Sequence, residues 1–244
     1  MAWLRERNTR RQLGRMTLTD LAVKYGTDKW GSHFYTRHYE AHLARFRNQK
    51  FQLIEIGVGG YNNEGIGGAS LQMWRSFFPK ARIIGVDIED KSFVDTHRVR
   101  TVIGDQTDAD LLRRLVLHGL PTMVFIDDGS HRPADVIKTF SVAFPLLPDG
   151  AVYAIEDIQT SYWPEFGGSE DLNDQTTSIA LVKRLIDGLN HEEFLDPGYK
   201  PSYFDEHVRA VHCYHNLVVI EKGNNQEGTN KRAVLGERYG DSSQ

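Results

Sequence analysis

The sequence predicts an α/β fold, a single domain built on a mostly parallel, seven-stranded sheet. Short apolar segments alternate with helix-like segments from residue 51 onward, and this alternation is typical of parallel sheets. The last two apolar segments, 208–214 and 217–221, are separated only by His215-Asn216, which predicts a terminal antiparallel hairpin. With 244 residues, 40% of them hydrophobic, the chain is long enough to bury one sizeable core.

The strands before the hairpin are predicted from short apolar runs rich in β-branched residues. Each run is bounded by glycine, proline or acidic residues, which favour turns over a continued strand. The turn Pro148-Asp149-Gly150, for example, marks the start of the fifth run. The predicted strands are 51–56, 82–86, 99–103, 122–126 and 151–155.

The helices are predicted from apolar side chains at helical spacing and from residues that begin helices. Thr17 and Asp20 are typical of a helix N-cap region, and Pro133 suits a first turn. In the segment 69–78 the large apolar side chains fall on one face, and the acidic first turn after Asp108 suits the helix dipole. The predicted helices are 17–25, 34–45, 69–78, 108–118, 133–144 and 175–189.

Flanking segments surround the predicted domain. Residues 1–45 form a helical lead or lid, in which 1–15 are a solvated helix or a frayed arm. Residues 46–223 form the domain. Residues 224–244 are polar and nearly free of large apolar side chains, which predicts a disordered tail.

Composition narrows the class of partner. The formal net charge of −4 gives no basic field for nucleic acid, and no apolar stretch approaches the ~20 residues of a membrane helix. The single cysteine, Cys213, allows no intramolecular disulfide, which favours a reducing compartment. No secretory signal is recognised at the N-terminus. We therefore expect a cytoplasmic protein that binds neither nucleic acid nor membrane.

Two short polar runs follow predicted strands and point to a metal site with a base. Asp127-Asp128-Gly129-Ser130-His131 follows the strand 122–126, and Glu156-Asp157 follows the strand 151–155. Ligands of open α/β sheets bind outside the carboxyl ends of the strands. Clustered carboxylates suit a hard divalent cation, and a neutral histidine can take a proton.

A glycine-rich turn and three acids predict a nucleotide site at the same edge. Glu55-Ile56-Gly57-Val58-Gly59-Gly60 ends the first strand, where glycine allows close approach of backbone to a ligand. Asp87 closes the second strand and suits a ribose diol, and Asp105 follows the third and suits an exocyclic amine. Glu55 suits a positively charged amino group. A single such acid can equally cap a turn, but three in register favour adenosine joined to an amino acid.

Six segments, spread from about residue 18 to residue 221, match the motifs of a known family. On these residues the chain resembles class I S-adenosylmethionine-dependent methyltransferases, and more closely the magnesium-dependent sugar O-methyltransferases of the mycinamicin and tylosin macrolide pathways. It also resembles a related mycobacterial enzyme that caps the mannoside precursor of methylmannose polysaccharide. The segments are Lys24-Tyr25-Gly26-Thr27-Asp28-Lys29, Glu55-Ile56-Gly57-Val58-Gly59-Gly60, Gly67-Gly68-Ala69-Ser70-Leu71, Gly104-Asp105-Gln106, Asp127-Asp128-Gly129-Ser130-His131 and Ile155-Glu156-Asp157.

The resemblance implies a Rossmann-like methyltransferase domain, S-adenosyl-L-methionine and Mg²⁺ as cofactors, and a sugar or glycoside as acceptor. It implies Asp128, Glu156 and Asp157 as metal ligands and His131 as the base. The expected acceptor is a glycosylated natural product of the macrolide type or an oligosaccharide precursor such as a mannoside, and a homo-oligomer is expected. The implied cofactor residues are Thr27, Glu55, Gly57, Gly59, Ser70, Asp87, Asp105, Gln106 and Asp127.

Other functions remain open from the residues alone. A catechol-type metal-dependent O-methyltransferase combines the same fold, cation and diol, and related metal-dependent antibiotic hydroxylases share the fold. A nicotinamide dehydrogenase is disfavoured by the glycine spacing. A non-catalytic S-adenosylmethionine-binding protein is disfavoured by the intact carboxylates. Tyr162 and Trp163 can stack on a sugar or pack in a lid, and residues 25–29 can close over the cofactor or form a turn at Gly26.

Overall fold

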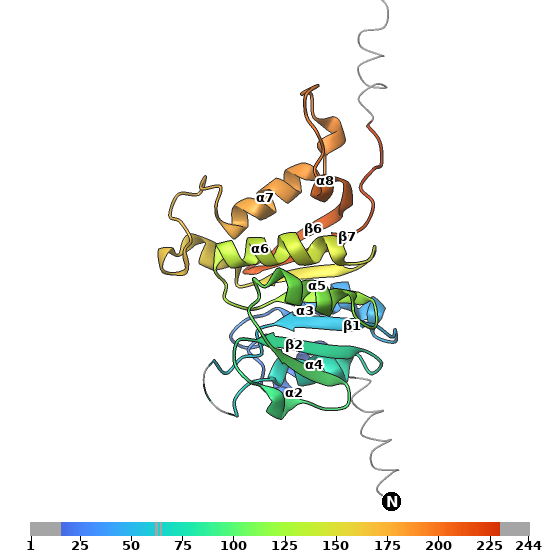
Figure 1. Cartoon of the computed structure of the whole chain (residues 1–244), viewed down its shortest axis with the longest axis vertical. Helices are drawn as coiled ribbons and strands as arrows, with labels where there is room; N and C mark the ends of the chain where they lie inside the picture. The colour runs from blue at the N-terminus through green and yellow to red at the C-terminus, as the bar shows by residue number, and fades with distance from the viewer. Residues whose placement is uncertain (1–15, 62, 64, 230–244) are drawn as a thin grey trace, which may run out of the picture.

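A computed structural model describes residues 16–61, 63 and 65–229. Their strands form one seven-stranded sheet in the order β3-β2-β1-β4-β5-β7-β6 (Figure 1). Only β7 runs against its two neighbours, β5 and β6, so the predicted mostly parallel sheet with a terminal hairpin is confirmed. The strands are β1 (Gln52–Ile56), β2 (Arg82–Asp87), β3 (Val99–Ile103), β4 (Thr122–Asp127), β5 (Val152–Glu156), β6 (Val208–Tyr214) and β7 (Leu217–Lys222).

Helices cover both faces of the sheet because alternate strand residues point to opposite faces. Leu53 packs in the core beneath α2, α3 and α4, whereas Ile54 packs in the core beneath α5, α6 and α7 (Figure 1). The α-helices are α2 (Leu18–Tyr25), α3 (Thr36–Leu43), α4 (Ala69–Phe77), α5 (Ala109–Leu117), α6 (Pro133–Ala143), α7 (Ser178–Gly188) and α8 (Tyr203–His207). The 3₁₀ turns are η1 (Ala44–Phe46), η2 (Ser92–Val94), η3 (Phe144–Leu146), η4 (Ile158–Tyr162), η5 (Pro164–Phe166) and η6 (His191–Glu193).

The predicted elements are present, with corrections at their ends. Thr17 forms a capping box with Asp20, as its sequence indicates, and α2 begins after it. The predicted helix 34–45 is wrong at both ends, since α3 covers Thr36–Leu43 and a 3₁₀ turn follows. The predicted helix 175–189 begins only at Ser178, because the Thr177 side chain caps it. The short helix α8 is missed by periodicity, and a capping box stabilises it.

The flanking predictions are tested only in part. The arm 1–15 and the tail residues 230–244 lie outside the described residues. No helix of the described part is long and apolar enough to cross a membrane.

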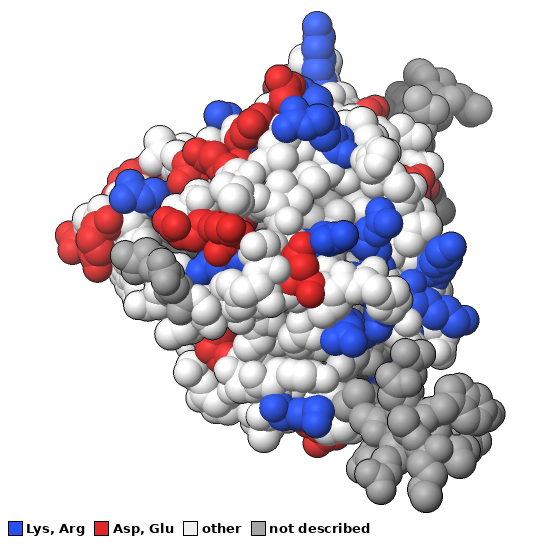
Figure 2. Space-filling view, turned by 60° about the horizontal axis from the view of Figure 1, so that its bottom comes forward, with Lys and Arg blue, Asp and Glu red and all other residues white. Residues whose placement is uncertain are grey.

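Acidic and basic side chains are distributed unevenly over one face of the molecule. On the face drawn in Figure 2, acidic side chains gather toward the left and basic side chains toward the right. A hollow of about 570 Å³ lies where the strands begin, lined in part by Arg82, Arg113, Arg114 and His118. It is therefore remote from the predicted site, which lies where the strands end.

The glycine turn after β1 is packed against the loop that follows β4. Gly57 has a φ of +86°, and a Cβ there would stand 1.9 Å from the backbone oxygen of Asp128. The amide of Asp128 in turn donates to the carbonyl of Ile56 at 3.0 Å. Gly59 has a φ of +76° but nothing within 4 Å of its Cβ position. The first glycine therefore lets two strand ends approach, whereas the second needs only its backbone angle.

The two glycines make a matched pair for mutation. Gly59→Ala is expected to cost about 1–2 kcal/mol of folding stability, the strain of the left-handed conformation. Gly57→Ala carries the same strain and also drives a methyl group into the Asp128 carbonyl, so its loss of stability is expected to be clearly larger. Urea unfolding midpoints of the two variants measure the difference. Equal losses would show that the turn can move away from the β4 loop.

Candidate active site

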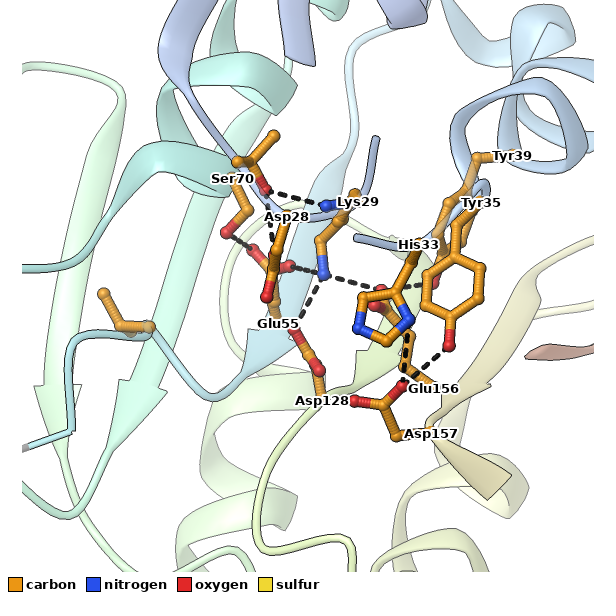
Figure 3. Close-up of polar contacts among 12 residues, drawn as sticks. Asp28, Lys29, His33, Tyr35, Tyr39, Glu55, Ser70, Asp128, Glu156 and Asp157 are labelled. Carbon is orange, nitrogen blue, oxygen red and sulfur yellow. Dashed lines mark hydrogen bonds and ion pairs between the residues drawn. The ribbon is translucent and has the colours of Figure 1, made fainter. Parts of the chain in front are cut away.

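The strand register brings the predicted site residues to one edge of the sheet. Ile56 pairs with Asp127 between β1 and β4, and Asp127 pairs with Ile155 between β4 and β5. The next residues along the chain therefore lie at neighbouring strand ends, with Asp128 directly after β4 and Glu156 as the last residue of β5. The edge predicted from the motifs is confirmed as the place where these acids meet (Figure 3).

Lys29 lies at the centre of a buried carboxylate cluster. Its Nζ is 2.7 Å from Asp128 Oδ2, 2.7 Å from Glu156 Oε1 and 3.2 Å from Glu55 Oε1. The Lys29 side chain is 1% exposed, and those of Glu55 and Glu156 are 0% and 3% exposed. The ammonium group enters from the N-terminal lead and bridges three strand ends (Figure 3).

Burial and mutual charge decide the protonation of this cluster. Burial alone would lower the pKa of Lys29, but the three carboxylates outweigh it and raise the pKa well above its usual value. Burial raises the pKa of Glu55, and burial together with Asp128 raises that of Glu156 well above its usual value. A further cation that contacts the oxygens of these carboxylates would stabilise their ionised form.

A second group contains Asp128, His131 and Asp157. One ligand atom from each lies within 4.8 Å of the others, and His131 Nε2 is 3.7 Å from Asp157 Oδ2. All three residues are partly exposed, whereas Lys29, Glu55 and Glu156 are buried. Asp128 belongs to both groups, so the three predicted metal ligands share one edge, but Glu156 and Asp157 belong to different groups.

His131 and Asp157 are held in strained backbone conformations. Their φ angles are +57° and +51°, in the left-handed region that non-glycine residues rarely adopt. The hydroxyl of Thr160 lies 2.6 Å from the carbonyl oxygen of His131 and 3.0 Å from that of Asp157. One buried side chain thus ties both residues together, and strain of this kind is typical of functional positions.

The lead supplies site residues that the motifs did not single out. Tyr35 donates to Asp157 Oδ1 at 2.7 Å, and Tyr39 donates to Glu156 Oε1 at 2.6 Å. His33 Nδ1 lies 3.6 Å from the same oxygen of Asp157. Burial raises the pKa of both tyrosines, which keeps them protonated donors. Tyr35 and Tyr39 are four residues apart at the start of α3, and this spacing could have indicated from the sequence that the two side chains lie on the same side of the helix.

The predicted cofactor residues around the glycine turn form one connected set. Asp87 Oδ2 accepts from the amide of Val58 at 2.9 Å, so it supports the turn while remaining half-buried. Ser70, at the start of α4, donates to Glu55 Oε2 at 2.9 Å. Thr27 is buried beside Lys29, whose amide it accepts at 3.5 Å.

The predicted cofactor residues after β3 and β4 form a second set. Gln106 donates to Asp127 Oδ1 at 3.2 Å and accepts from the amide of Ser130 at 2.7 Å. Tyr153 also donates to Asp127, and burial raises the pKa of Asp127 to about 7. Asp105 is exposed and accepts from the amide of Thr107 at 2.7 Å. Asp127 and Gln106 therefore brace the loop that carries His131.

The donor chemistry of the edge fits a hard divalent cation. Oxygen ligands outnumber nitrogen ligands, and one buried ammonium already holds three carboxylates together. Asp128, with Asp157 or Glu156, can hold such an ion, and the hydroxyls of Tyr35 and Tyr39 orient the two acids.

Two further sequence expectations concern residues beyond this edge. Tyr162 and Trp163, at the end of η4, are 39% and 42% exposed, and Trp163 contacts the ring of Phe166. His191 lies just after α7, and its Nδ1 is 3.1 Å from the carbonyl oxygen of Gly188. Gly26, with a φ of +69°, ends α2 as a turn, and Lys29 beyond it reaches the site.

Comparison with known proteins identifies relatives over most of the chain. Mycinamicin VI 2''-O-methyltransferase of Micromonospora griseorubida and demethylmacrocin O-methyltransferase of Streptomyces fradiae are each 46% identical over 214 residues, 86% of this chain. A tetracenomycin-C rhamnosyl 2'-O-methyltransferase of Streptomyces olivaceus is 46% identical over 206 residues. The chain covers 54% of each, so it spans about half the length of these relatives. No protein-family model matches.

Comparison with solved structures identifies relatives of the same kind. The MycE methyltransferase of mycinamycin biosynthesis, in complex with Mg and SAH, matches with a TM-score of 0.84 and 46% identity over 87% of this chain and 56% of that one. A second MycE complex, which also holds mycinamycin VI, has a TM-score of 0.84 and 45% identity. The methyltransferase fold and the resemblance to sugar O-methyltransferases are thus confirmed. The resemblance to the mycobacterial enzyme stays a prediction.

Replacing Lys29 with Met is expected to destabilise the metal-free protein, because it leaves the buried Glu55 and Glu156 and the partly exposed Asp128 without their shared cation. Removing one partner from a buried ion cluster costs about 3–5 kcal/mol. Added Mg²⁺ is expected to restore more stability to the variant than it adds to the wild type, since a ligand stabilises the state that binds it.

Urea unfolding with and without Mg²⁺ measures both effects. Lys24→Met, which removes an exposed lysine of the same lead, is the matched control. A midpoint for Lys29→Met equal to that of the wild type in metal-free buffer would contradict this role for Lys29.

Proposed function

We propose that this chain is an S-adenosylmethionine-dependent, Mg²⁺-dependent O-methyltransferase whose acceptor is a sugar hydroxyl of a glycoside. The observation that carries the proposal is the group of Asp128, His131 and Asp157 beside the glycine turn. It supplies a cation site and a base next to a cofactor site. The similarity to sugar O-methyltransferases over 86% of the chain supports the same reading.

Asp128, Asp157 and Glu156 would hold the cation, with Asp128 central to both groups. When bound, Mg²⁺ lowers the pKa of a hydroxyl that contacts it. The chain's own residues set the geometry. Tyr35 fixes one oxygen of Asp157 and leaves the other toward His131, and Lys29 keeps Asp128 and Glu156 at the same edge.

His131 would accept the proton of the attacking hydroxyl. Its side chain is 24% exposed, so an acceptor can reach it, and the nearby Asp157 can orient the ring. The left-handed backbone of His131, whose carbonyl oxygen accepts from Thr160, places the imidazole 3.7 Å from Asp157. Methyl transfer itself needs no protein nucleophile, since the sulfonium is already a good leaving group. Alignment of hydroxyl and methyl group supplies much of the remaining rate.

The cofactor would lie along the glycine turn. Asp87 offers a carboxylate beside the turn for a ribose diol, and Asp105 is exposed at the end of the next strand. Glu55 would act indirectly, because it pairs with Lys29 and accepts from Ser70 beneath the glycine turn. Asp127 and Gln106 brace the loop between the cofactor and metal sides.

The names of the relatives support the acceptor class. Two relatives of Streptomyces olivaceus are named for a rhamnosyl tetracenomycin-C and one of Streptomyces antibioticus for L-olivosyl-oleandolide, which favours a glycosylated natural product over a catechol. An oligosaccharide precursor such as a mannoside is the alternative within the same chemistry. The half-exposed rings of Tyr162 and Trp163 offer apolar faces for a sugar. A cytoplasmic location and a homo-oligomeric state stay predictions.

Incubation of the purified protein with S-adenosylmethionine, Mg²⁺ and a panel of acceptors tests the proposal. The panel contains a glycosylated macrolide, a rhamnosyl tetracenomycin, a simple mannoside and a catechol, and mass spectrometry detects the methylated product. We expect methylation of a glycoside, lost in EDTA and restored by Mg²⁺. Methylation of the catechol alone would establish the catechol-type alternative. Cofactor binding without turnover on any acceptor would support a non-catalytic role.

Asp87→Ala is expected to weaken S-adenosylmethionine binding at least about tenfold, because the ribose loses a charge-assisted hydrogen bond worth roughly 1.5–3 kcal/mol. Isothermal titration measures the dissociation constant. Asp90→Ala, which removes an exposed acid from the same loop, is the matched control. An unchanged constant for Asp87→Ala would leave Asp87 a structural role through the amides of Val58 and Glu89, from which it accepts.

His131→Ala is expected to reduce turnover by roughly 10²- to 10⁴-fold, the usual contribution of a general base, while cofactor affinity stays close to that of the wild type. His33→Ala is the matched variant, because His33 faces the other oxygen of Asp157. Single-turnover rates and cofactor titration separate chemistry from binding. A large loss in His33→Ala with near-normal turnover in His131→Ala would transfer the role of base to His33.

A further inference from the structure

Two histidines and a glutamate meet outside the active site, between the lead and the terminal hairpin. His42 lies on α3, His212 on β6 and Glu221 on β7. One nitrogen of each imidazole and one carboxylate oxygen lie within 4.8 Å of one another. The motifs and the proposed reaction use none of the three. They are brought together only because α3 packs beside the last two strands.

The distances are close to those of a metal site. Glu221 Oε1 is 3.6 Å from His42 Nδ1 and 3.8 Å from His212 Nε2. Ligand atoms of a tetrahedral zinc ion, each about 2.0–2.1 Å from the metal, lie about 3.4 Å apart. The two distances to Glu221 exceed this spacing by only a few tenths of an ångström, and the two imidazole nitrogens lie within 4.8 Å of each other.

Both imidazoles have a nitrogen available for a ligand. His42 Nε2 lies 2.9 Å from the hydroxyl of Tyr214, which orients the ring and leaves Nδ1 toward Glu221. His212 Nε2 is buried and has no hydrogen-bond partner within the described ranges 16–61, 63 and 65–229. Burial, helped by His212, lowers the pKa of His42, which keeps it in the neutral form that binds metals.

Two arginines also contact the glutamate. Arg209 pairs with Oε2 of Glu221, and Arg45 Nη1 lies 3.4 Å from either oxygen. Burial would raise the pKa of Glu221, but the arginines outweigh it and keep the carboxylate ionised. The side chains of Arg45 and Arg209 are 40% and 50% exposed, so solvent screens their charges. The arginines account for the ionised glutamate, but not for two adjacent imidazoles that share its other oxygen.

We propose that His42, His212 and Glu221 bind a divalent transition cation such as Zn²⁺. Two imidazoles and one carboxylate suit zinc, cobalt or nickel and do not suit Mg²⁺, which takes oxygen ligands. The ion would link α3 to the hairpin β6–β7. Because α3 also carries Tyr39, which holds Glu156, an ion here would stiffen the attachment of the lead to the active site.

The site is tested by titrating zinc into the metal-free protein in the presence of excess Mg²⁺ and measuring the heat of binding by calorimetry. We expect one site in the wild type, weakened at least tenfold in His42→Gln and in His212→Gln. His131→Gln and His118→Gln, which alter the active-site histidine and an exposed histidine elsewhere, are expected to keep it. Cobalt should give the intense visible bands of a tetrahedral site in the wild type and lose them in the same two variants.

Thermal unfolding of each variant with and without zinc separates zinc binding from any small effect of the substitution on folding. Zinc is expected to raise the melting temperature of the wild type and of His118→Gln, but not that of His42→Gln or His212→Gln. The absence of a zinc site in the wild type would overturn the proposal. So would zinc binding that is lost in His131→Gln and kept in the other variants, because the ion would then lie in the catalytic group. Neither result depends on whether the protein methylates a glycoside.

Discussion

The buried ammonium of Lys29 is the interaction on which the arrangement of the site depends. Three carboxylates from three strand ends would repel one another in a water-poor edge of the sheet, and the ammonium compensates them. Lys29 belongs to the lead, so the same contact attaches residues 27–39 to the sheet. Tyr35 and Tyr39 extend this attachment by donating to Asp157 and Glu156. The lead is therefore a wall of the active site as well as a flanking segment.

Backbone strain is concentrated at the same place. Within the described residues, the non-glycine positions with positive φ are Tyr61, His131, Asp157 and Asn216. His131 and Asp157 face each other, and the hydroxyl of Thr160 reaches the carbonyl oxygens of both. The carbonyl of Asn216 also lies within hydrogen-bond distance of the Tyr35 hydroxyl, which holds Asp157. These contacts stabilise backbone conformations that non-glycine residues rarely adopt, and such strain is typical of functional sites.

The cofactor and metal sides share backbone as well as side chains. Gly57 lies against the carbonyl of Asp128, and the amide of Asp128 donates to the carbonyl of Ile56. Movement of the glycine turn would therefore shift the central carboxylate of both acidic groups. Gln106 provides a parallel link, because its amide joins Asp127 to the loop of His131. A methyl donor bound at the turn and a hydroxyl held at Asp128 would be positioned by one rigid frame.

The sequence by itself determined the strands, the helices between them except α8, and the acids at the strand ends. Apolar periodicity and position at a strand end are local properties of the sequence. It could not determine which groups those acids contact. Lys29 meets Glu156, 127 residues away, and the adjacent Glu156 and Asp157 diverge to different partners. The meeting of His42 with His212 and Glu221 likewise follows from α3 packing beside the hairpin. These contacts were decided by tertiary structure, since only the packed chain fixes which distant charges share a desolvated space.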